Sequence, residues 1–187
     1  MTPPVSREAY YDTGMAILAD QGYGGLKLAE VCSRLGVTSG SFYHYFTSWS
    51  VYTHGLVEYW LQERRRRIEQ KIESSPDPRQ RIEAMLQAGR RLAHGAEAGI
   101  RVWSALDPAV RKIQEQVDRL RFDAVYDAAT ELLGDGRQAQ VFAQCVLYTL
   151  VGYEQAMLPR DDEALAWIVE QLLAALDAGT FADVPTP

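Results

Sequence analysis

Residues 36–46 read GVTSGSFYHYF, and this stretch decides how the N-terminal part of the chain folds. Helical spacing precedes the turn at 28–35 and follows it at 38–45, so a short turn separates two short helices. Gly36 permits the positive φ of such a turn, and Thr38 can accept hydrogen bonds from the free N–H groups that open the second helix. This arrangement is typical of a helix-turn-helix, in which the second helix enters the major groove of DNA.

The side chains of this second helix fall into two sets. Phe42 and Phe46 are four residues apart, so both can turn inward onto the first helix of the chain. The other residues are short polar or aromatic groups that can reach phosphates or base edges, and Gly40 lets backbone lie close to DNA. A purely packing role for the three helices is the alternative. We predict DNA contacts at Lys27, Thr38, Ser39, Gly40, Ser41, Tyr43, His44, Tyr45 and Ser48.

The rest of the chain also has helical spacing, and strand-like alternation nowhere persists, which predicts an all-α fold of about nine helices. Capping residues, glycines and prolines place the helix boundaries, and Gly95–Gly99 is expected to be a non-helical stretch between two helices. Residues after Thr180 are expected to form a loose tail. The predicted helices cover about 6–20, 28–35, 38–45, 48–75, 79–93, a short segment around Trp103, 108–134, 137–158 and 161–179.

The stretch around the turn resembles the TetR family of transcriptional regulators, whose pattern here is close to GVSKGTLYHHF. Thr38 and Ser41 are conservative replacements within that pattern. The likeness is specific over about Ala9–Phe46, and beyond this range it rests on the number and order of helices. The positions that match outright are Gly36, Val37, Gly40, Tyr43, His44 and Phe46.

The chain departs from the family pattern in its charge. The family often has Lys at the position of Ser39 and another Lys where this chain has Trp49, and residues 36–50 contain no Lys, Arg, Asp or Glu at all. Hydroxyls, imidazole and backbone N–H groups would then hold the phosphates. We therefore expect weak non-specific binding and a shallow dependence of affinity on salt.

The resemblance implies a homodimeric, ligand-responsive regulator, most often a repressor, that binds a pseudo-palindromic double-stranded DNA operator. It implies a helix-turn-helix domain at 1–48 and a helical effector-binding and dimerisation domain at 49–187. In such proteins an unknown small molecule moves the fourth helix and with it the recognition helices. A dimeric protein-interaction module with a degenerate helix-turn-helix is the alternative function.

The C-terminal domain offers two sets of candidate residues. Aromatic residues between its helices are candidates for an effector pocket, although each can equally be a core residue. In a lone subunit the apolar faces of the last two helices would pack inward, but the resemblance implies that they form the dimer interface, where Gly152 would allow close approach. The pocket candidates are Trp60, Trp103, Phe122, Tyr126 and Tyr148, and the interface candidates are Val141, Cys145, Tyr148, Gly152, Leu165, Ile168, Leu172 and Leu176.

Charged side chains elsewhere are expected to lie at the surface. Arg64–Arg67 resembles a nucleic-acid patch, but four successive helical residues sweep about 300° around the axis and cannot all face one duplex. We interpret them as a solvated helix with ion pairs four residues apart. His94, Arg101 and Glu154 could supply polar contacts to an effector, but each is likewise expected at the surface.

Composition limits the remaining functional classes. The net charge is −6, and it belongs entirely to the residues after 75, because residues 1–75 hold eight basic and eight acidic side chains. Two cysteines give no disulfide framework or zinc site, and we expect no metal and no cofactor. No membrane span, signal peptide or nucleophile motif is found, so we expect a cytoplasmic protein that is not an enzyme.

Overall fold

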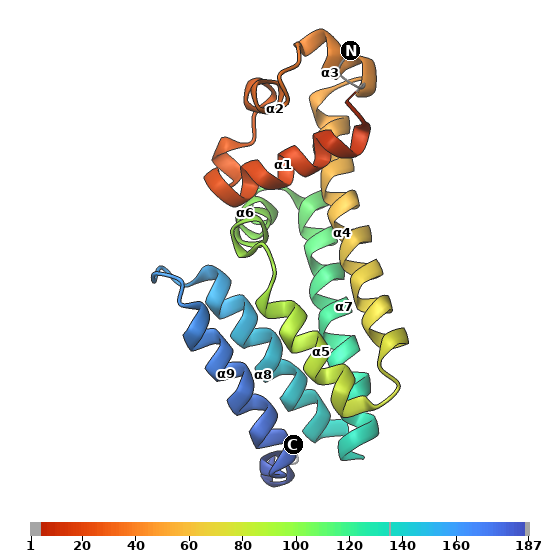
Figure 1. Cartoon of the computed structure of the whole chain (residues 1–187), viewed down its shortest axis with the longest axis vertical. Coiled ribbons are helices and arrows are strands. Elements are labelled where there is room, and N and C mark those ends of the chain that lie inside the picture. Colours follow the sequence, from red (N-terminus) through yellow and green to blue (C-terminus); the bar gives the residue numbers. More distant parts are fainter. Residues whose placement is uncertain (1–4, 135, 186–187) are drawn as a thin grey trace. The chain divides into compact units, whose positions relative to one another are not determined.

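The regular structure of the chain is helical throughout the part that the structure describes. The computed structural model describes residues 5–134 and 136–185, and within these ranges it has nine α-helices and two short 3₁₀ turns (Figure 1). The all-α prediction is confirmed. The helices are α1 Arg7–Gln21, α2 Leu28–Leu35, α3 Ser39–Tyr45, α4 Trp49–Ser74, α5 Pro78–Arg90, α6 His94–Ser104, α7 Pro108–Leu133, α8 Gly136–Gln155 and α9 Asp162–Asp177, and the 3₁₀ turns are η1 Tyr23–Gly25 and η2 Thr180–Asp183.

Packing divides the chain into two compact units that do not follow chain order. The first unit holds the residues up to Glu63 together with Ala93–Gln116, and the second holds Arg64–Leu92 together with the residues from Val117 onward. The long helices α4 and α7 therefore contribute residues to both units. The sequence predicted a boundary at residue 48 between a DNA-binding domain and an effector-binding and dimerisation domain. That functional boundary stays a prediction.

Capping residues predicted from the sequence open several helices. Ser6 accepts a hydrogen bond from the N–H of Ala9, Thr38 from that of Ser41, and Asp161 from that of Ala164. Each bond satisfies one of the N–H groups that a helix start leaves without an intrahelical partner. Local signals of this kind place the starts of the helices well. The ends are less well predicted, because α8 stops at Gln155, before the predicted end at Leu158.

The core of the helix-turn-helix is built from aromatic rings. Phe42 and Phe46 are fully buried, and their ring centroids lie 5.8 and 5.5 Å from that of Tyr10 in α1. The hydroxyl of Tyr52 in α4 donates to the carbonyl oxygen of Tyr10 at 2.9 Å, and burial raises the pKa of Tyr52 well above its usual value. The inward direction predicted for Phe42 and Phe46 is confirmed. Rings from α1, α3 and α4 thus fix the angle at which the recognition helix α3 stands.

The prediction of a non-helical stretch at Gly95–Gly99 is wrong, because both glycines lie inside α6. A Cβ atom at Gly95 would collide with the carbonyl oxygen of Ala19 and would lie 3.1 Å from the Cα and carbonyl carbon of that residue. At Gly99 it would lie 3.1 Å from the carbonyl oxygen of Leu18. The two glycines therefore let α6 approach the backbone of α1, and this contact outweighs their poor helix propensity.

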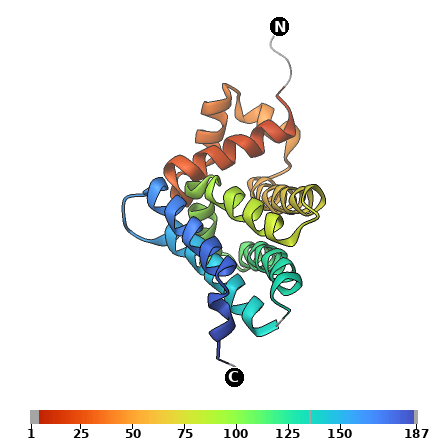
Figure 2. The same ribbon diagram turned by 60° about the horizontal axis from the view of Figure 1, so that its bottom comes forward.

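The second unit is a group of packed helices in which α8 and α9 form an antiparallel pair (Figures 1 and 2). Its core includes Ile82 from α5, Ala129 from α7, Phe142 from α8 and Leu173 from α9. Phe181 in η2 packs edge-to-face on Phe142, with ring centroids 5.1 Å apart. The expected loose tail is therefore wrong for residues 180–183, where burial of Phe181 orders a short turn. Residues 186–187 of that tail lie outside the described residues.

Candidate nucleic-acid interface and ligand cavity

The turn between α2 and α3 has the geometry that the sequence predicts. Gly36 adopts φ 65° and ψ 33°, a left-handed conformation that closes α2, and its N–H reaches the carbonyls of Cys32 and Ser33. Three residues later α3 begins at Ser39, with the hydroxyl of Thr38 at 3.2 Å from the N–H of Ser41. The two helices are therefore set as in a helix-turn-helix.

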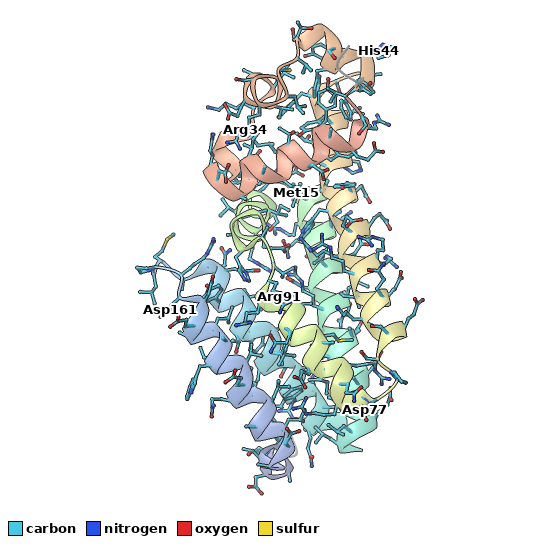
Figure 3. All side chains as sticks on the ribbon, in the orientation of Figure 1. Met15, Arg34, His44, Asp77, Arg91 and Asp161 are labelled. Atoms are coloured by element: carbon cyan, nitrogen blue, oxygen red, sulfur yellow. The ribbon has the colours of Figure 1, made fainter. Side chains whose placement is uncertain are left out.

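The outer face of α3 presents the predicted residues to solvent. Ser39, Gly40, Tyr43 and His44 are exposed, with Tyr43 at 51% exposure. His44 is labelled in Figure 3, on the outside of α3. The nearest atom that a Cβ at Gly40 would meet within 4 Å is the hydroxyl of Thr38. A short polar and aromatic surface is thus open to a duplex.

Other predicted DNA contacts have structural partners as well. The hydroxyl of Ser41 lies 3.2 Å from that of Tyr10, and the ring of Tyr45 packs on Tyr10 at 5.4 Å. Ser48 caps α4 by accepting from the N–H of Val51 at 3.1 Å. All three are half-buried, so they support the exposed face and present only part of their surface. Lys27 is exposed at the N-cap position of α2, where its side chain makes no cap hydrogen bond.

Arg7 is a neighbour of the recognition helix that sequence reasoning missed. Its Nη2 atom donates to the carbonyl oxygen of Tyr45 at 3.0 Å, and its guanidinium carbon lies 4.8 Å from the ring centroid of Phe46. A cation therefore stands at the C-terminal end of α3, where it complements the helix dipole. Although residues 36–50 contain no charged side chain, the fold places the guanidinium of Arg7 beside them. Only the fold could reveal this, since Arg7 is 38 positions from Tyr45.

Arg34 of α2 is less available to a phosphate. It donates to Asp20 at 2.7 Å and to Glu30 at 2.8 Å, and the hydrogen bond to Glu30 is the main cause that raises the pKa of Arg34. The same bond lowers the pKa of the Glu30 carboxyl. Two carboxylates thus balance the charge of this side chain, which is labelled in Figure 3. The helix-turn-helix keeps few cations for DNA.

The five predicted pocket aromatics divide between the two units. Trp60 and Trp103 belong to the first unit and are almost fully buried, the latter stacked on Tyr23 at 5.0 Å. Phe122 and Tyr126 stack on each other at 5.6 Å in the second unit. Tyr148 is 65% exposed. None of the five lines the cavity described below, and their role in binding an effector stays a prediction.

Buried polar groups of the first unit meet at Trp60. The indole N–H of Trp60 donates to a carboxylate oxygen of Glu97 at 3.0 Å, and Glu97 is 2% exposed. His94, one helical turn before it on α6, is buried as well. The surface position expected for His94 is therefore wrong. Glu154 in the second unit is also buried, against the same expectation, whereas Arg101 is half-buried.

The second unit has a partly open cavity of about 410 Å³, a size within the range of small-molecule sites. Helices α5, α7, α8 and α9 and the C-terminal half of α4 line it. Much of its wall is apolar, formed by residues such as Leu86, Val125, Val146, Val169 and Leu172. Arg64 lines it too and is only 8% exposed, so the solvated position expected for Arg64 is wrong, while Arg65–Arg67 are exposed.

The predicted dimer residues divide between surface and core. On α8, Tyr148 and Gly152 are exposed, and Val141 and Cys145 are half-buried. The prediction is wrong for Leu165 and Leu176 of α9, which are 3% exposed because they turn into the second unit. Leu172 is half-buried in the cavity wall. The exposed apolar residues of α9 are Ile168, as predicted, and Trp167, which sequence reasoning missed and which is 61% exposed.

Within 5–134 and 136–185, no group of three or more His, Cys, Asp or Glu side chains is placed to hold a metal ion. No helix of the described part combines the length and the apolar character that crossing a membrane requires.

Comparisons with known proteins agree with this geometry. Residues 11–48 match the family model of bacterial regulatory proteins of the tetR family. The HTH-type transcriptional regulator BetI of Rhizobium meliloti (strain 1021) is 25% identical over 117 residues, which are 63% of this chain. The match spans only 57% of that relative's length.

Solved structures share the fold along nearly the whole chain. A putative transcriptional regulator from Saccharomonospora viridis in complex with choline has a TM-score of 0.73 and 12% identity, with 90% of this chain and 95% of that chain covered. NemR of E. coli in its reduced form has a TM-score of 0.69 and 19% identity, with 92% and 95% covered. The regulator FadR from Bacillus subtilis in complex with stearoyl-CoA has a TM-score of 0.59 and 15% identity, over 92% and 95%.

The helix-turn-helix geometry, the match over residues 11–48 and the shared fold agree with one another and with the resemblance noted in the sequence. Residues 11–48 therefore match the tetR family of bacterial regulatory proteins, and most of the chain shares the fold of solved transcriptional regulators.

Proposed function

We propose that this chain is a homodimeric transcriptional repressor that releases a pseudo-palindromic operator when a small molecule binds in its second unit. The exposed face of α3 carries the DNA-binding part of this proposal. Ser39, Tyr43 and His44 point to solvent there, while Phe42 and Phe46 hold the helix from behind. Such a surface reads DNA through hydroxyl, imidazole and aromatic groups. A regulator that meets chromosomal DNA works in the cytoplasm, which is part of the proposal.

DNA binding is tested by selection from random duplex oligonucleotides, followed by fluorescence anisotropy with the selected sequence. We expect a palindromic consensus, and we expect Tyr43→Ala and His44→Ala each to weaken binding about tenfold or more. Gln62→Ala, an exposed change on α4, serves as the control that leaves binding intact. Recovery of no consensus would remove the proposal and favour the protein-interaction module, whose support is the charge-poor recognition unit.

Dimerisation through α8 and α9 is supported by the apolar groups that these helices expose. Tyr148 and Gly152 on α8, and Trp167 and Ile168 on α9, are the exposed residues that support this part of the proposal. Exposed apolar patches commonly mark interaction sites. A homodimer also matches a palindromic operator, because two equal recognition helices read two equal half-sites.

The oligomeric state is tested by sedimentation equilibrium. We expect a dimer for the native chain and a monomer for Trp167→Glu, because a buried unpaired carboxylate is costly in an apolar interface. Gln80→Glu on α5 introduces the same charge at an exposed position and should leave the dimer intact. A native chain that stays monomeric at micromolar concentration contradicts this part of the proposal.

The response to a ligand is supported by the cavity in the second unit. The choline and stearoyl-CoA complexes of two proteins of the same fold make a small-molecule site in this chain a reasonable proposal. A ligand changes DNA affinity only if it binds the DNA-incompetent conformation more tightly. Release of the selected operator on addition of a cavity ligand tests this step, and unchanged DNA affinity at saturating ligand would refute it.

A further inference from the structure

The cavity of the second unit carries charge of one sign only. Its lining contains six of the chain's 19 Lys and Arg residues, and among the described residues that line it there is no Asp or Glu, although the chain has 25 of these. This contrast is sharp because the protein as a whole has a net charge of −6. The six cations are Arg64, Arg67, Lys71, Arg90, Arg91 and Arg121.

The six cations differ in how far they are buried. Arg64 is buried and Arg90 and Arg121 are half-buried, whereas Arg67, Lys71 and Arg91 are exposed. Arg91 is labelled in Figure 3, just past the C-terminal end of α5. The inner guanidinium groups also interact with other groups of the chain, which holds them in position. Exposed cations can attract an anion from solvent, and less exposed ones can bind it in surroundings of lower dielectric constant.

Helix stability alone accounts for only part of this arrangement. Arg90 and Arg91 lie at the C-terminal end of α5, where cations also complement the helix dipole. Lys71 lies in the last turn of α4 and shares that explanation. Arg64 and Arg121 do not share it, because Arg64 lies in the middle of α4 and Arg121 in the middle of α7. Cations on three different helices therefore converge on one cavity whose remaining wall is largely apolar.

We infer that the ligand of this cavity is an amphipathic anion, with a carboxylate or another oxyanion at one end and an apolar chain or ring system at the other. The oxyanion end meets guanidinium groups, which bind such groups with charge-assisted hydrogen bonds. The apolar end meets the Leu and Val side chains of α5, α8 and α9. This inference rests on the proposed function in one respect, since it names the chemistry of the effector that the second unit would bind.

The test compares three probes of equal chain length by isothermal titration calorimetry with the full chain and no DNA: decanoate, decan-1-ol and decyltrimethylammonium. We expect decanoate to bind at least tenfold more tightly than decan-1-ol, and decyltrimethylammonium to bind more weakly than both. Arg121→Gln should weaken decanoate at least tenfold and leave decan-1-ol unchanged. Arg119→Gln, an exposed change two residues away on the same helix, should leave both affinities unchanged.

Three results would overturn the inference. One is binding of decyltrimethylammonium as tight as that of decanoate, which needs no variant and so does not depend on whether a mutant folds. Another is an equal loss of decanoate and decan-1-ol in a folded Arg121→Gln variant, which indicates a structural role only. The third is no binding of decanoate at millimolar concentration. Operator binding is measured separately, so decanoate binding without operator release rejects the ligand response alone, and operator binding without anion preference rejects this inference alone.

Discussion

Substitution of Gly95 by alanine should destabilise the first unit even though alanine is the better helix former. In an open helical position this change stabilises by up to about 1 kcal/mol. At Gly95 the new Cβ would meet the carbonyl group of Ala19, which is backbone and cannot rotate away. Leu18, beside Ala19 on α1, is fully buried, so α1 has little freedom to retreat.

The expected size follows from these two opposing effects. Overpacking typically costs about 1–3 kcal/mol, and the gain in helix propensity offsets about 1 kcal/mol of it. Gly99 should respond less, because its Cβ would lie 3.1 Å from the oxygen of Leu18 and a small shift relieves that contact. A Cβ added at Gly89 in α5 would meet no atom within 4 Å, so alanine should raise stability there. The predicted order of stability is Gly89→Ala, then Gly99→Ala, then Gly95→Ala.

Urea unfolding followed by tryptophan fluorescence measures this order. Trp60 and Trp103 lie in the first unit, where α6 packs on α1, and Trp167 lies in the second unit, which contains Gly89, so the emission reports both units. We expect the urea midpoint of Gly95→Ala to fall below that of the native chain with little change in slope. A Gly95→Ala variant as stable as Gly89→Ala would refute the argument that α6 requires its glycines for contact with α1.

Three further predictions concern the second unit and the DNA surface. Arg79 donates to Asp177 at 2.6 and 2.9 Å, and these hydrogen bonds lower the pKa of the Asp177 carboxyl. The pair therefore stabilises the fold at pH values above the unfolded pKa of about 3.9. This stabilisation is lost as the pH falls through the lower pKa of the folded state. Because the pair is largely exposed, Asp177→Asn should cost only about 0.5 kcal/mol in urea unfolding at pH 7, and a cost that persists at pH 2 would contradict this cause. Gly40→Ala should leave the urea midpoint nearly unchanged, because the added Cβ meets nothing closer than 3.6 Å in the free chain. It should weaken operator binding in anisotropy, because we predict that the DNA backbone approaches Gly40 closely. Equal operator affinity would argue against that close approach. A plot of log affinity against log salt should have a shallow slope, below about six released ions per half-site, because Arg34 is balanced by two carboxylates, and a steeper slope would refute the interpretation of a charge-poor interface.

Local signals in the sequence predicted much of the fold. The glycine turn at Gly36 and the caps at Ser6, Thr38 and Asp161 each act within three or four residues, so they can be recognised without knowledge of the tertiary structure. The same holds for Phe42, whose spacing and neighbours indicate an inward direction. The helix-turn-helix was therefore the part most open to prediction.

Features that depend on distant partners were not predictable. Gly95 looks like a helix breaker until α1 is seen against it, and Arg7 gains its place only through its contact with Tyr45. The apolar stripe of α9 suggests contact with a partner chain, but Leu165 and Leu176 point inward. Apolar residues cover more than one face of this helix, and spacing alone cannot tell which face the chain itself buries.

The cavity escapes prediction for a related reason. Aromatic residues are the obvious pocket candidates in the sequence, whereas the cavity walls are largely aliphatic and its charged groups are arginines and a lysine from three helices. Arg64 alone illustrates the difficulty, because the run of four arginines around it favours a solvated helix. No signal of sequence distance or spacing joins Arg64 to Arg121, so their convergence emerges only from the packing of α4 and α7.

The placement of the four tryptophans makes the chain suitable for optical measurements without any attached dye. Trp49 packs on Tyr52 at 5.0 Å beside the recognition helix, Trp60 and Trp103 are buried around α6, and Trp167 is exposed on α9. Emission from an exposed indole lies at longer wavelength than that from a buried one. In variants that keep a single tryptophan, with phenylalanine at the other three positions, the emission wavelength would therefore report separately on three places. These are the surroundings of α3, the interior of the first unit and the exposed face of α9.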